Sequence, residues 1–158
     1  MHVRAAKTED ITFMMALAAE SPEAAHWTES AYQQIFSSTT PRRHCVVAEQ
    51  GLVGIGFIVA REGGQEWEIE NVVIAKNSRR QGVGAKLVRE ILALALASGA
   101  ADIFLEVRES NQAARRLYVA CGFQMTGRRS KYYSDPAEDA VLFRLSFPQS
   151  EKNPSSGD

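Results

Sequence analysis

The chain has 158 residues, of which 45% are hydrophobic and 23% charged, and its formal net charge is -1. This balance fits one compact domain with its own core and excludes a chain that is disordered throughout. The near-neutral charge argues against a direct nucleic-acid partner. Every apolar run is shorter than the ~20 residues that cross a bilayer, and the start of the chain lacks the pattern of a signal peptide, so we expect a cytoplasmic protein with no membrane partner.

Two cysteines, Cys45 and Cys121, lie in apolar surroundings and are far apart in the sequence. They lack CxxC spacing and a plausible His partner, so they do not form a typical metal-binding pattern. We expect two buried, reduced thiols and no metal site.

The first half of the chain combines helix and strand patterns. Acids after Thr8 and apolar residues at helical spacing predict a first helix, which breaks around Ser21 and Pro22. Strand patterns follow, joined by turns at Gly51 and Gly63. The predicted elements are a strand at 2–6, helices at 8–18 and 28–36, and strands at 45–49, 52–60 and 66–75.

The second half contains the clearest helix pattern. Residues 82–98 carry apolar side chains at i, i+3 and i+4, and Gly99 ends the helix. The remaining predicted elements are a strand at 102–108, a helix at 111–121, and strands at 123–126 and 140–147 separated by a loop at 128–136. Strands in antiparallel series followed by alternating strands and helices predict a mixed sheet domain of the α/β or α+β class.

A short turn, Arg79-Arg80-Gln81-Gly82-Val83-Gly84, lies between a strand pattern and the 82–98 helix. Its two glycines let the backbone approach a ligand, and the free amides that open the helix favour an anion. Arg79 and Arg80 add positive charge. The turn therefore predicts a phosphate site, although the same pattern also occurs in plain tight turns.

Four separated motifs occur in order along the chain. They are Val72-Val73-Ile74, the turn Arg79 to Gly84, the run Leu105-Glu106-Val107-Arg108-Glu109-Ser110-Asn111, and Leu117-Tyr118 followed by Gly122-Phe123. With these motifs the chain resembles the GNAT acetyltransferases over roughly residues 3–145. Residues 67–71, 105–111, 132–133 and 138–140 resemble the ribosomal-protein-alanine N-acetyltransferase (RimI-type) branch.

The resemblance implies a GNAT fold in residues 1–147. This fold is a mixed, mostly antiparallel central sheet of about seven strands, splayed between strands 4 and 5, with about four flanking helices. The gap would take the pantetheine of acetyl-CoA, and the turn would hold the pyrophosphate. The implied acetyl-CoA-binding residues are Val72, Val73, Ile74, Arg79, Arg80, Gln81, Gly82, Val83, Gly84, Asn111 and Tyr118. We expect the polar residues 148–158 to form a disordered tail.

Glu106 is the candidate general base. Strand alternation puts it on the face opposite Leu105 and Val107, and the resemblance assigns it as the proton acceptor, acting directly or through water. A solvated strand carboxylate is the alternative. Glu68 and Glu70 are rival bases, and alternation places both on one face of the preceding strand, so it does not choose between them.

Tyr118 is the candidate proton donor for the departing thiolate, because a phenol with a pKa of ~10 lies near a thiol with a pKa of ~8.5. Asn111 and Tyr118 are i, i+7 on one predicted helix and share a face. One end of that face can contact the cofactor arm while the other reaches the sulfur. A buried structural Tyr is the alternative.

The acceptor implied by the resemblance is the N-terminal α-amine of a protein, an alanine on a small-subunit ribosomal protein. An α-amine with a pKa of ~7.7–8.0 is partly neutral at physiological pH, whereas a lysine amine at ~10.4 needs more help from a base. Trp27, Tyr132 and Tyr133 are the candidate acceptor-binding residues, with core packing as the alternative for Trp27. The basic residues Arg128, Arg129 and Lys131 either steer an acidic segment or are solvated.

Other functions are open at this stage. Within the class, the acceptor can be a lysine side chain or a small-molecule amine. From another class, the domain can bind acyl-CoA as a non-catalytic sensor, which the presence of both Glu106 and Tyr118 disfavours. We expect a monomer.

Overall fold

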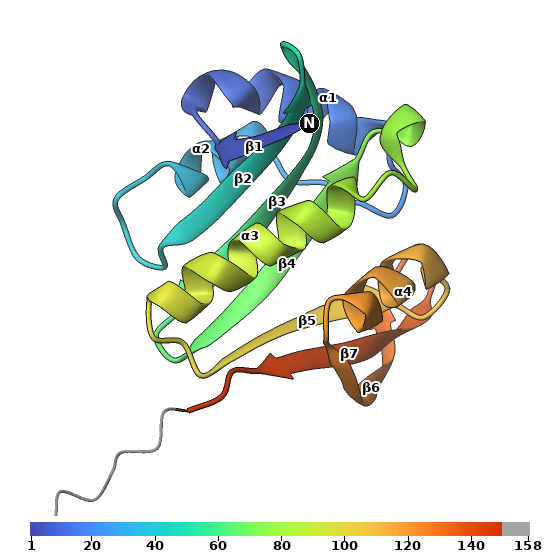
Figure 1. Cartoon of the computed structure of the whole chain (residues 1–158). Helices are drawn as coiled ribbons and strands as arrows, with labels where there is room; N and C mark the ends of the chain where they lie inside the picture. The colour runs from blue at the N-terminus through green and yellow to red at the C-terminus, as the bar shows by residue number, and fades with distance from the viewer. Residues whose placement is uncertain (150–158) are drawn as a thin grey trace, which may run out of the picture.

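The computed structural model describes residues 1–149 and shows a mixed seven-stranded sheet with helices on both faces (Figure 1). The helices are α1 (Ile11–Ala19), α2 (Glu29–Ile35), α3 (Val83–Ala97) and α4 (Gln112–Ala120), with short 3-10 helices at Thr8–Asp10 and Lys76–Ser78. The strands are β1 (His2–Ala5), β2 (Arg43–Gln50), β3 (Val53–Gly63), β4 (Glu66–Ile74), β5 (Asp102–Arg108), β6 (Gln124–Tyr133) and β7 (Glu138–Ser146). The predicted tail lies almost wholly outside the described residues.

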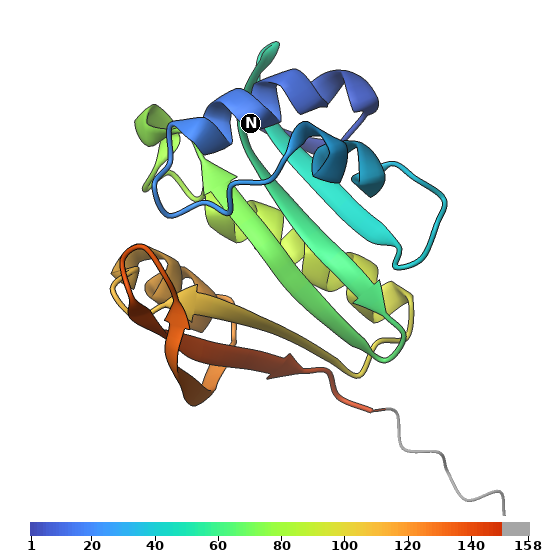
Figure 2. The same cartoon turned by 180° about the vertical axis from the view of Figure 1, so that it is seen from behind.

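The strand order is β1-β2-β3-β4-β5-β7-β6, and β4 and β5 are the parallel pair. Helices α3 and α4 lie on one face, and α1 and α2 cover the β1–β4 half of the other (Figures 1 and 2). On that second face, β5, β7 and β6 carry no helix (Figure 2). The predicted sheet class, the number of strands and the number of helices are confirmed.

The sheet splays between β4 and β5. Their pairing covers Glu66 to Glu68 against Asp102 to Phe104 and then stops. Just beyond it, β4 contains a bulge, because Ala60 faces Ile69 while its neighbour Val59 faces Asn71. A bulge bends its strand and increases the local twist, which accounts for the separation of β4 from β5. The splay agrees with the expectation from the sequence, whereas the bulge was not predicted.

Two apolar cores hold the layers together, one on each face of the sheet. The larger core packs α3 and α4 against β2–β5 and β7 and includes Trp67, which is fully buried. The smaller core packs α1 and α2 against β2–β4 around Tyr32 and Phe57. Cys45 is buried, but Cys121 is only half-buried because it lies at the C-terminal end of α4, so one of the two expected buried thiols is wrong.

The predicted loop at 128–136 is wrong for most of its length. Strand β6 continues through Arg128 and Arg129 to Tyr133, and β7 begins at Glu138. β6 is an edge strand with mostly exposed residues, so it lacks the apolar alternation from which strands are predicted. The register shift between Arg129 and Tyr133 obscures the pattern further.

Asp10 fastens the first strand to the first helix. Its two carboxylate oxygens each accept a hydrogen bond of 2.8 Å from the Arg4 guanidinium, and Oδ2 also accepts one of 2.7 Å from the Lys7 amide. These hydrogen bonds, that from Arg4 above all, lower the pKa of Asp10 below its ordinary value of 3.8.

Asp10→Asn is therefore expected to lower the free energy of unfolding at pH 7 by about 1–3 kcal/mol. Because the pKa is depressed in the folded state, the ionised group stabilises the fold above its ordinary pKa. That stabilisation is lost as the pH falls through the folded-state value. Urea unfolding of wild type and variant at pH 7 and pH 3 should show a gap that shrinks at pH 3. The exposed Glu9→Gln is the control, and an equal gap at both pH values would contradict the assignment.

Candidate active site

Most of the predicted site residues lie on elements next to the splay between β4 and β5. The turn that precedes α3 lies at the end of β4, and α4 follows β5 on the same face of the sheet (Figure 1). Glu106 lies on β5 and Tyr118 on α4. The acceptor residues Tyr132 and Tyr133 end β6, while Trp27 lies between α1 and α2.

The turn before α3 has the geometry of an anion cradle. Arg80 and Gly82 both adopt positive φ, 62° and 79°, and Gly82 is the N-cap of α3. Amides in the first turn of a helix have no acceptor within it, and the first cap bond here runs from the Lys86 amide to the Gly82 carbonyl. A Cβ at Gly82 would meet no atom within 4 Å, so no described residue packs against this position. Residues 79–83 can therefore hold a pyrophosphate.

Gly84 lies at the contact between α3 and α4. A Cβ at this position would lie 2.9 Å from the Leu117 Cδ2 atom of α4. The missing side chain lets α3 and α4 pack closely at this point. The two glycines therefore differ: an added Cβ would meet no atom within 4 Å at Gly82 but would meet Leu117 at Gly84.

Gly82→Ala is expected to lower the melting temperature, because a side chain at positive φ costs about 1–2 kcal/mol. It should also raise the KM for acetyl-CoA several-fold, because relaxation of the strain turns the amides away from the cradle. Gly64→Ala is the matched control, since Gly64 has a φ of 67° and open space but lies in the β3–β4 turn. Equal effects of the two substitutions on this KM would contradict the cradle.

The end of β4 has backbone groups that no neighbouring strand pairs with in the described residues. The Ala75 amide donates to the Ile55 carbonyl at 2.8 Å, so in this antiparallel register Val73 also exchanges hydrogen bonds with Phe57. The backbone groups of Val72 and Ile74 point to the other edge, where pairing with β5 has ended. Val72 and Ile74 can therefore pair with a ligand arm, whereas the amide of Val73, also predicted to do so, is engaged by β3.

Arg79 and Gln81 support the turn by local hydrogen bonds. The Arg79 Nε donates to the Ile74 carbonyl at 3.4 Å, and its guanidinium lies 3.9 Å from Glu23 in the α1–α2 connection. The Gln81 side chain donates to the Asn77 carbonyl at 3.1 Å. The positive charge of Arg79 is thus held beside the cradle.

The three candidate bases lie on one face of the sheet but differ in their partners. Glu70 accepts two hydrogen bonds from Arg43, at 2.7 and 3.3 Å, and Glu68 accepts one from Arg61 at 2.6 Å. These hydrogen bonds occupy carboxylate oxygens that would otherwise be free to accept a proton from an amine.

Glu106 is held more loosely than its rivals. The Arg129 Nε lies 3.5 Å from its Oε1, and the Glu106 side chain is 11% exposed. Of the three carboxylates, Glu106 has the weakest contact with a guanidinium and is the best placed to accept a proton.

Tyr118 is buried on α4, with a tilted contact to Phe143 and an edge contact to Phe123. Burial raises the pKa of Tyr118 well above its ordinary value of 10, so the phenol stays protonated at physiological pH. The Asn111 Oδ1 caps α4 by accepting a hydrogen bond from the Ala114 amide at 3.2 Å. Asn111 thus orients the helix that carries Tyr118, and its Nδ2 has no hydrogen-bond partner within residues 1–149.

The acceptor candidates lie in two places. Tyr132 is 48% exposed, and the interaction of its hydroxyl with the Glu106 carboxylate raises its pKa. Tyr133 packs edge-on against Tyr132, and burial raises the pKa of Tyr133 to about 12. Trp27 instead packs against Tyr32 in the smaller core, which favours its structural alternative.

Asn71 was missed by sequence reasoning. Its side chain accepts from the Ala25 amide at 3.3 Å and donates to the Ala25 carbonyl at 3.4 Å, which fastens the α1–α2 connection to the bulge of β4. A buried Asn beside an apolar strand run is the signal that could have found it.

Two basic residues of β6 have acidic partners. Arg128 pairs with Glu109, and Arg129 pairs with Glu106.

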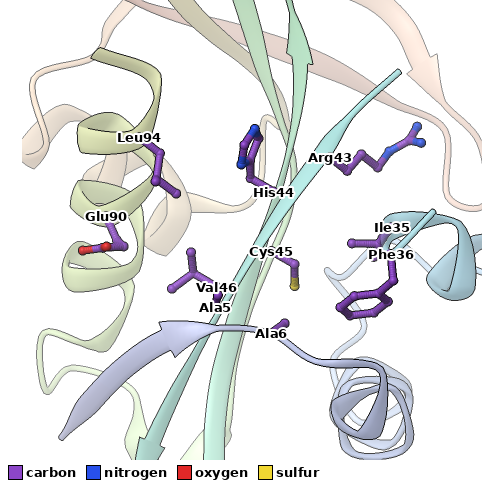
Figure 3. A pocket seen from close by; sticks show the side chains of 10 residues that line it. All are labelled: Ala5, Ala6, Ile35, Phe36, Arg43, His44, Cys45, Val46, Glu90 and Leu94. Atoms are coloured by element: carbon purple, nitrogen blue, oxygen red, sulfur yellow. The ribbon is translucent and has the colours of Figure 1, made fainter. Parts of the chain in front are cut away.

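A separate cavity of about 280 Å³ lies beside β2, away from these residues (Figure 3). Glu90 and Leu94 of α3 lie on one side of the strand and Ile35 and Phe36 at the end of α2 on the other (Figure 3). The cavity contains none of the predicted site residues. In the described part of the chain, no three His, Cys, Asp or Glu side chains are placed to hold a metal, and no helix is long and apolar enough to cross a membrane.

Comparison with known proteins agrees with this geometry. Residues 11–123 match the Acetyltransferase (GNAT) family. The chain belongs to the GNAT acetyltransferases. It is an acetyl-CoA-dependent N-acetyltransferase, with the splayed sheet of that family.

Two GNAT relatives are similar over most of their length. A Bacillus subtilis protein with the provisional name ribosomal protein bS18-alanine N-acetyltransferase is 31% identical over 145 residues, which cover 89% of this chain and 91% of that protein. The N-alpha-acetyltransferase RimI of Mycobacterium tuberculosis is 32% identical, over 75% and 74% of the two chains. The structure of the ribosomal-protein-S18-alanine N-acetyltransferase from Escherichia coli superimposes with a TM-score of 0.83 at 24% identity, covering 96% of this chain and 97% of that one, which supports the GNAT fold.

Proposed function

We propose that this enzyme transfers the acetyl group of acetyl-CoA to the N-terminal α-amine of a protein, an alanine on a small-subunit ribosomal protein. The observation that carries the catalytic part is the difference among the three carboxylates, because Glu106 alone of them lacks a close guanidinium bond. The acceptor is proposed from the names of the two relatives at 31% and 32% identity.

The chemistry needs one proton acceptor and one donor. The neutral amine nitrogen attacks the thioester carbon, and Glu106 takes the proton that the nitrogen loses. The free amide of Val72 or Ile74 can stabilise the negative charge on the carbonyl oxygen. The carbon–sulfur bond then breaks, and Tyr118 donates a hydrogen bond or a proton to the leaving sulfur. The products are the acetylated amine and the free thiol.

The buried Tyr118 changes one detail of this scheme. Its raised pKa makes full proton transfer to a thiolate less favourable than for an exposed phenol. A hydrogen bond to the developing negative charge on sulfur is strengthened in the same apolar surroundings. We therefore assign Tyr118 to stabilise the leaving thiolate first and to protonate it as the product departs.

The acceptor class is tested with a panel of amines assayed by release of free thiol. The panel contains peptides that begin with Ala, Ser or Met, the same peptides with a blocked N-terminus and an internal lysine, and polyamines. The Ala-starting peptide should have the highest kcat/KM, and its blocked form should be inactive. Preference for polyamines or for lysine would contradict the proposal, and cofactor binding without any transfer would indicate a sensor.

The protein acceptor is tested by mass spectrometry of ribosomal proteins from cells with and without the active enzyme. A gain of one acetyl group at the N-terminal alanine of one small-subunit protein is expected. An unchanged set of N-termini would overturn the ribosomal assignment while leaving acetyl transfer itself intact.

A further inference from the structure

Arg108, at the end of β5, contacts the tip of the β6–β7 hairpin, residues 131–137, through both terminal nitrogens and the central carbon of its guanidinium. Its Nη1 donates to the Pro136 carbonyl at 3.0 Å, and its Nη2 donates to the Ser134 carbonyl at 3.3 Å. The guanidinium carbon lies 4.5 Å from the centre of the Tyr133 ring. One side chain therefore fixes two backbone carbonyls and one aromatic ring of the hairpin tip.

Glu138 extends this contact to the segment just before α4. Its Oε2 accepts a hydrogen bond of 3.3 Å from the Arg108 Nη1, and its Oε1 accepts one from the Ser110 amide. Ser110 directly precedes Asn111, the N-cap of α4. The Arg108–Glu138 pair is only 23% and 17% exposed, so its charges are poorly screened by solvent.

The pair thus links elements that carry three parts of the proposed machinery. Arg108 lies two residues after Glu106 on the same face of β5. The hairpin tip carries Tyr132, whose hydroxyl interacts with Glu106, and α4 carries Tyr118. A shift of the tip relative to β5 would move Tyr132 and Tyr133 away from the amine that Glu106 deprotonates.

We propose that Arg108, anchored by Glu138, is a positioning residue that sets the affinity for the acceptor amine by holding the hairpin tip over Glu106. This inference rests on the proposed function, acetyl transfer to an α-amine with Glu106 as the base. Arg108 does not touch the reacting atoms, so its effect falls on the acceptor side. Lysine cannot replace it, because a single ammonium group lacks the planar fork that reaches two carbonyls while stacking on a ring.

Arg108→Lys is expected to raise the KM for the acceptor peptide about tenfold and to leave the KM for acetyl-CoA unchanged. The kcat measured at saturating peptide should stay close to that of wild type. In hydrogen-exchange measurements, the amides of residues 131–137 should exchange faster than in wild type. Glu138→Gln, which keeps the size of the side chain and loses its charge, should change the peptide KM in the same direction by a smaller factor.

Arg144→Lys is the matched control. Arg144 also stacks on an aromatic ring, 5.5 Å from the centre of Phe104, and pairs with Glu66 and Asp102, but at the opposite end of β5 from the hairpin tip. It should leave both KM values unchanged. A peptide KM in Arg108→Lys equal to that of Arg144→Lys overturns the inference. A rise in both KM values together with a fall in melting temperature also overturns it, because that result would indicate a general structural role.

Two further results separate this inference from the proposed function. If wild type prefers a different amine, the α-amine proposal fails, and the KM of Arg108→Lys for the preferred amine still tests the positioning role. If Arg108→Lys does not fold, Glu138→Gln decides, and an unchanged acceptor KM in that folded variant counts against the inference.

Discussion

Glu106→Gln is expected to lower kcat by about a hundredfold, because a positioned general base contributes about 10²–10⁴-fold to such a transfer. The amide keeps the shape of the side chain but cannot accept the proton of the attacking amine. The KM for acetyl-CoA should be unchanged, because the cradle and the edge of β4 contain no atom of Glu106. Steady-state kinetics with an α-amine peptide, together with a titration of acetyl-CoA binding, separate the two effects.

Glu70→Gln and Glu68→Gln are the matched controls for this prediction. Each removes one charge from the same face of the sheet, but the carboxylates that they replace are already bound by Arg43 and Arg61. Their kcat values should stay within about threefold of wild type. A large loss of kcat in Glu70→Gln with little loss in Glu106→Gln would show that the base lies on β4 and that Glu106 is a structural carboxylate.

Much of the fold follows from local patterns in the sequence. The apolar stripe of α3 and the alternation of β5 depend on neighbours within one element, so both were predicted close to their observed bounds. Strand β6 was cut short because an exposed edge strand needs no apolar face. The bulge at Glu70 was not predicted, because it arises from the register between β3 and β4 and no local sequence pattern encodes that register.

Some features of the candidate site also follow from short sequence motifs, and others depend on the fold. The turn at 79–84 and the positions of Glu106 and Tyr118 were predicted because their chemistry is carried by short motifs. The preference for Glu106 over Glu68 and Glu70 came from the resemblance alone, because the arginines of β2, β3 and β6 that distinguish the three carboxylates lie beside them only in the fold. A carboxylate can thus be bound by an arginine from a distant strand, and the sequence around the carboxylate does not indicate it.

The pairing of β3 with β4 adds a constraint to the thioester site. Because Val73 bonds to Phe57, the groups available to the ligand alternate along β4 at Val72 and Ile74. An acyl-CoA arm that pairs with this edge would therefore meet free backbone groups at a two-residue spacing. If the thioester carbonyl binds there as proposed, backbone groups hold it, and we expect side-chain substitutions at Val72 to Ile74 to act on it only indirectly.

Tyr118→Phe is expected to lower kcat by at least tenfold, because the leaving sulfur loses its only proposed hydrogen-bond donor. The phenylalanine ring keeps the contacts with Phe123 and Phe143, so the melting temperature should change little. The pH profile gives an independent test. Burial raises the pKa of Tyr118, so the donor stays protonated where a free phenol ionises. Wild-type kcat should therefore show no decline as the pH rises through 10, within the range in which the protein remains folded.

Tyr32→Phe is the matched control for the loss of a buried hydroxyl. Tyr32 is 1% exposed in the smaller core, and its hydroxyl has no hydrogen-bond partner among residues 1–149. Removing that hydroxyl should leave kcat unchanged and raise the melting temperature, because an unpaired buried polar group is destabilising. If Tyr118→Phe behaves like Tyr32→Phe, Tyr118 is a structural residue of the larger core, and the thiolate must take its proton from another group or from water.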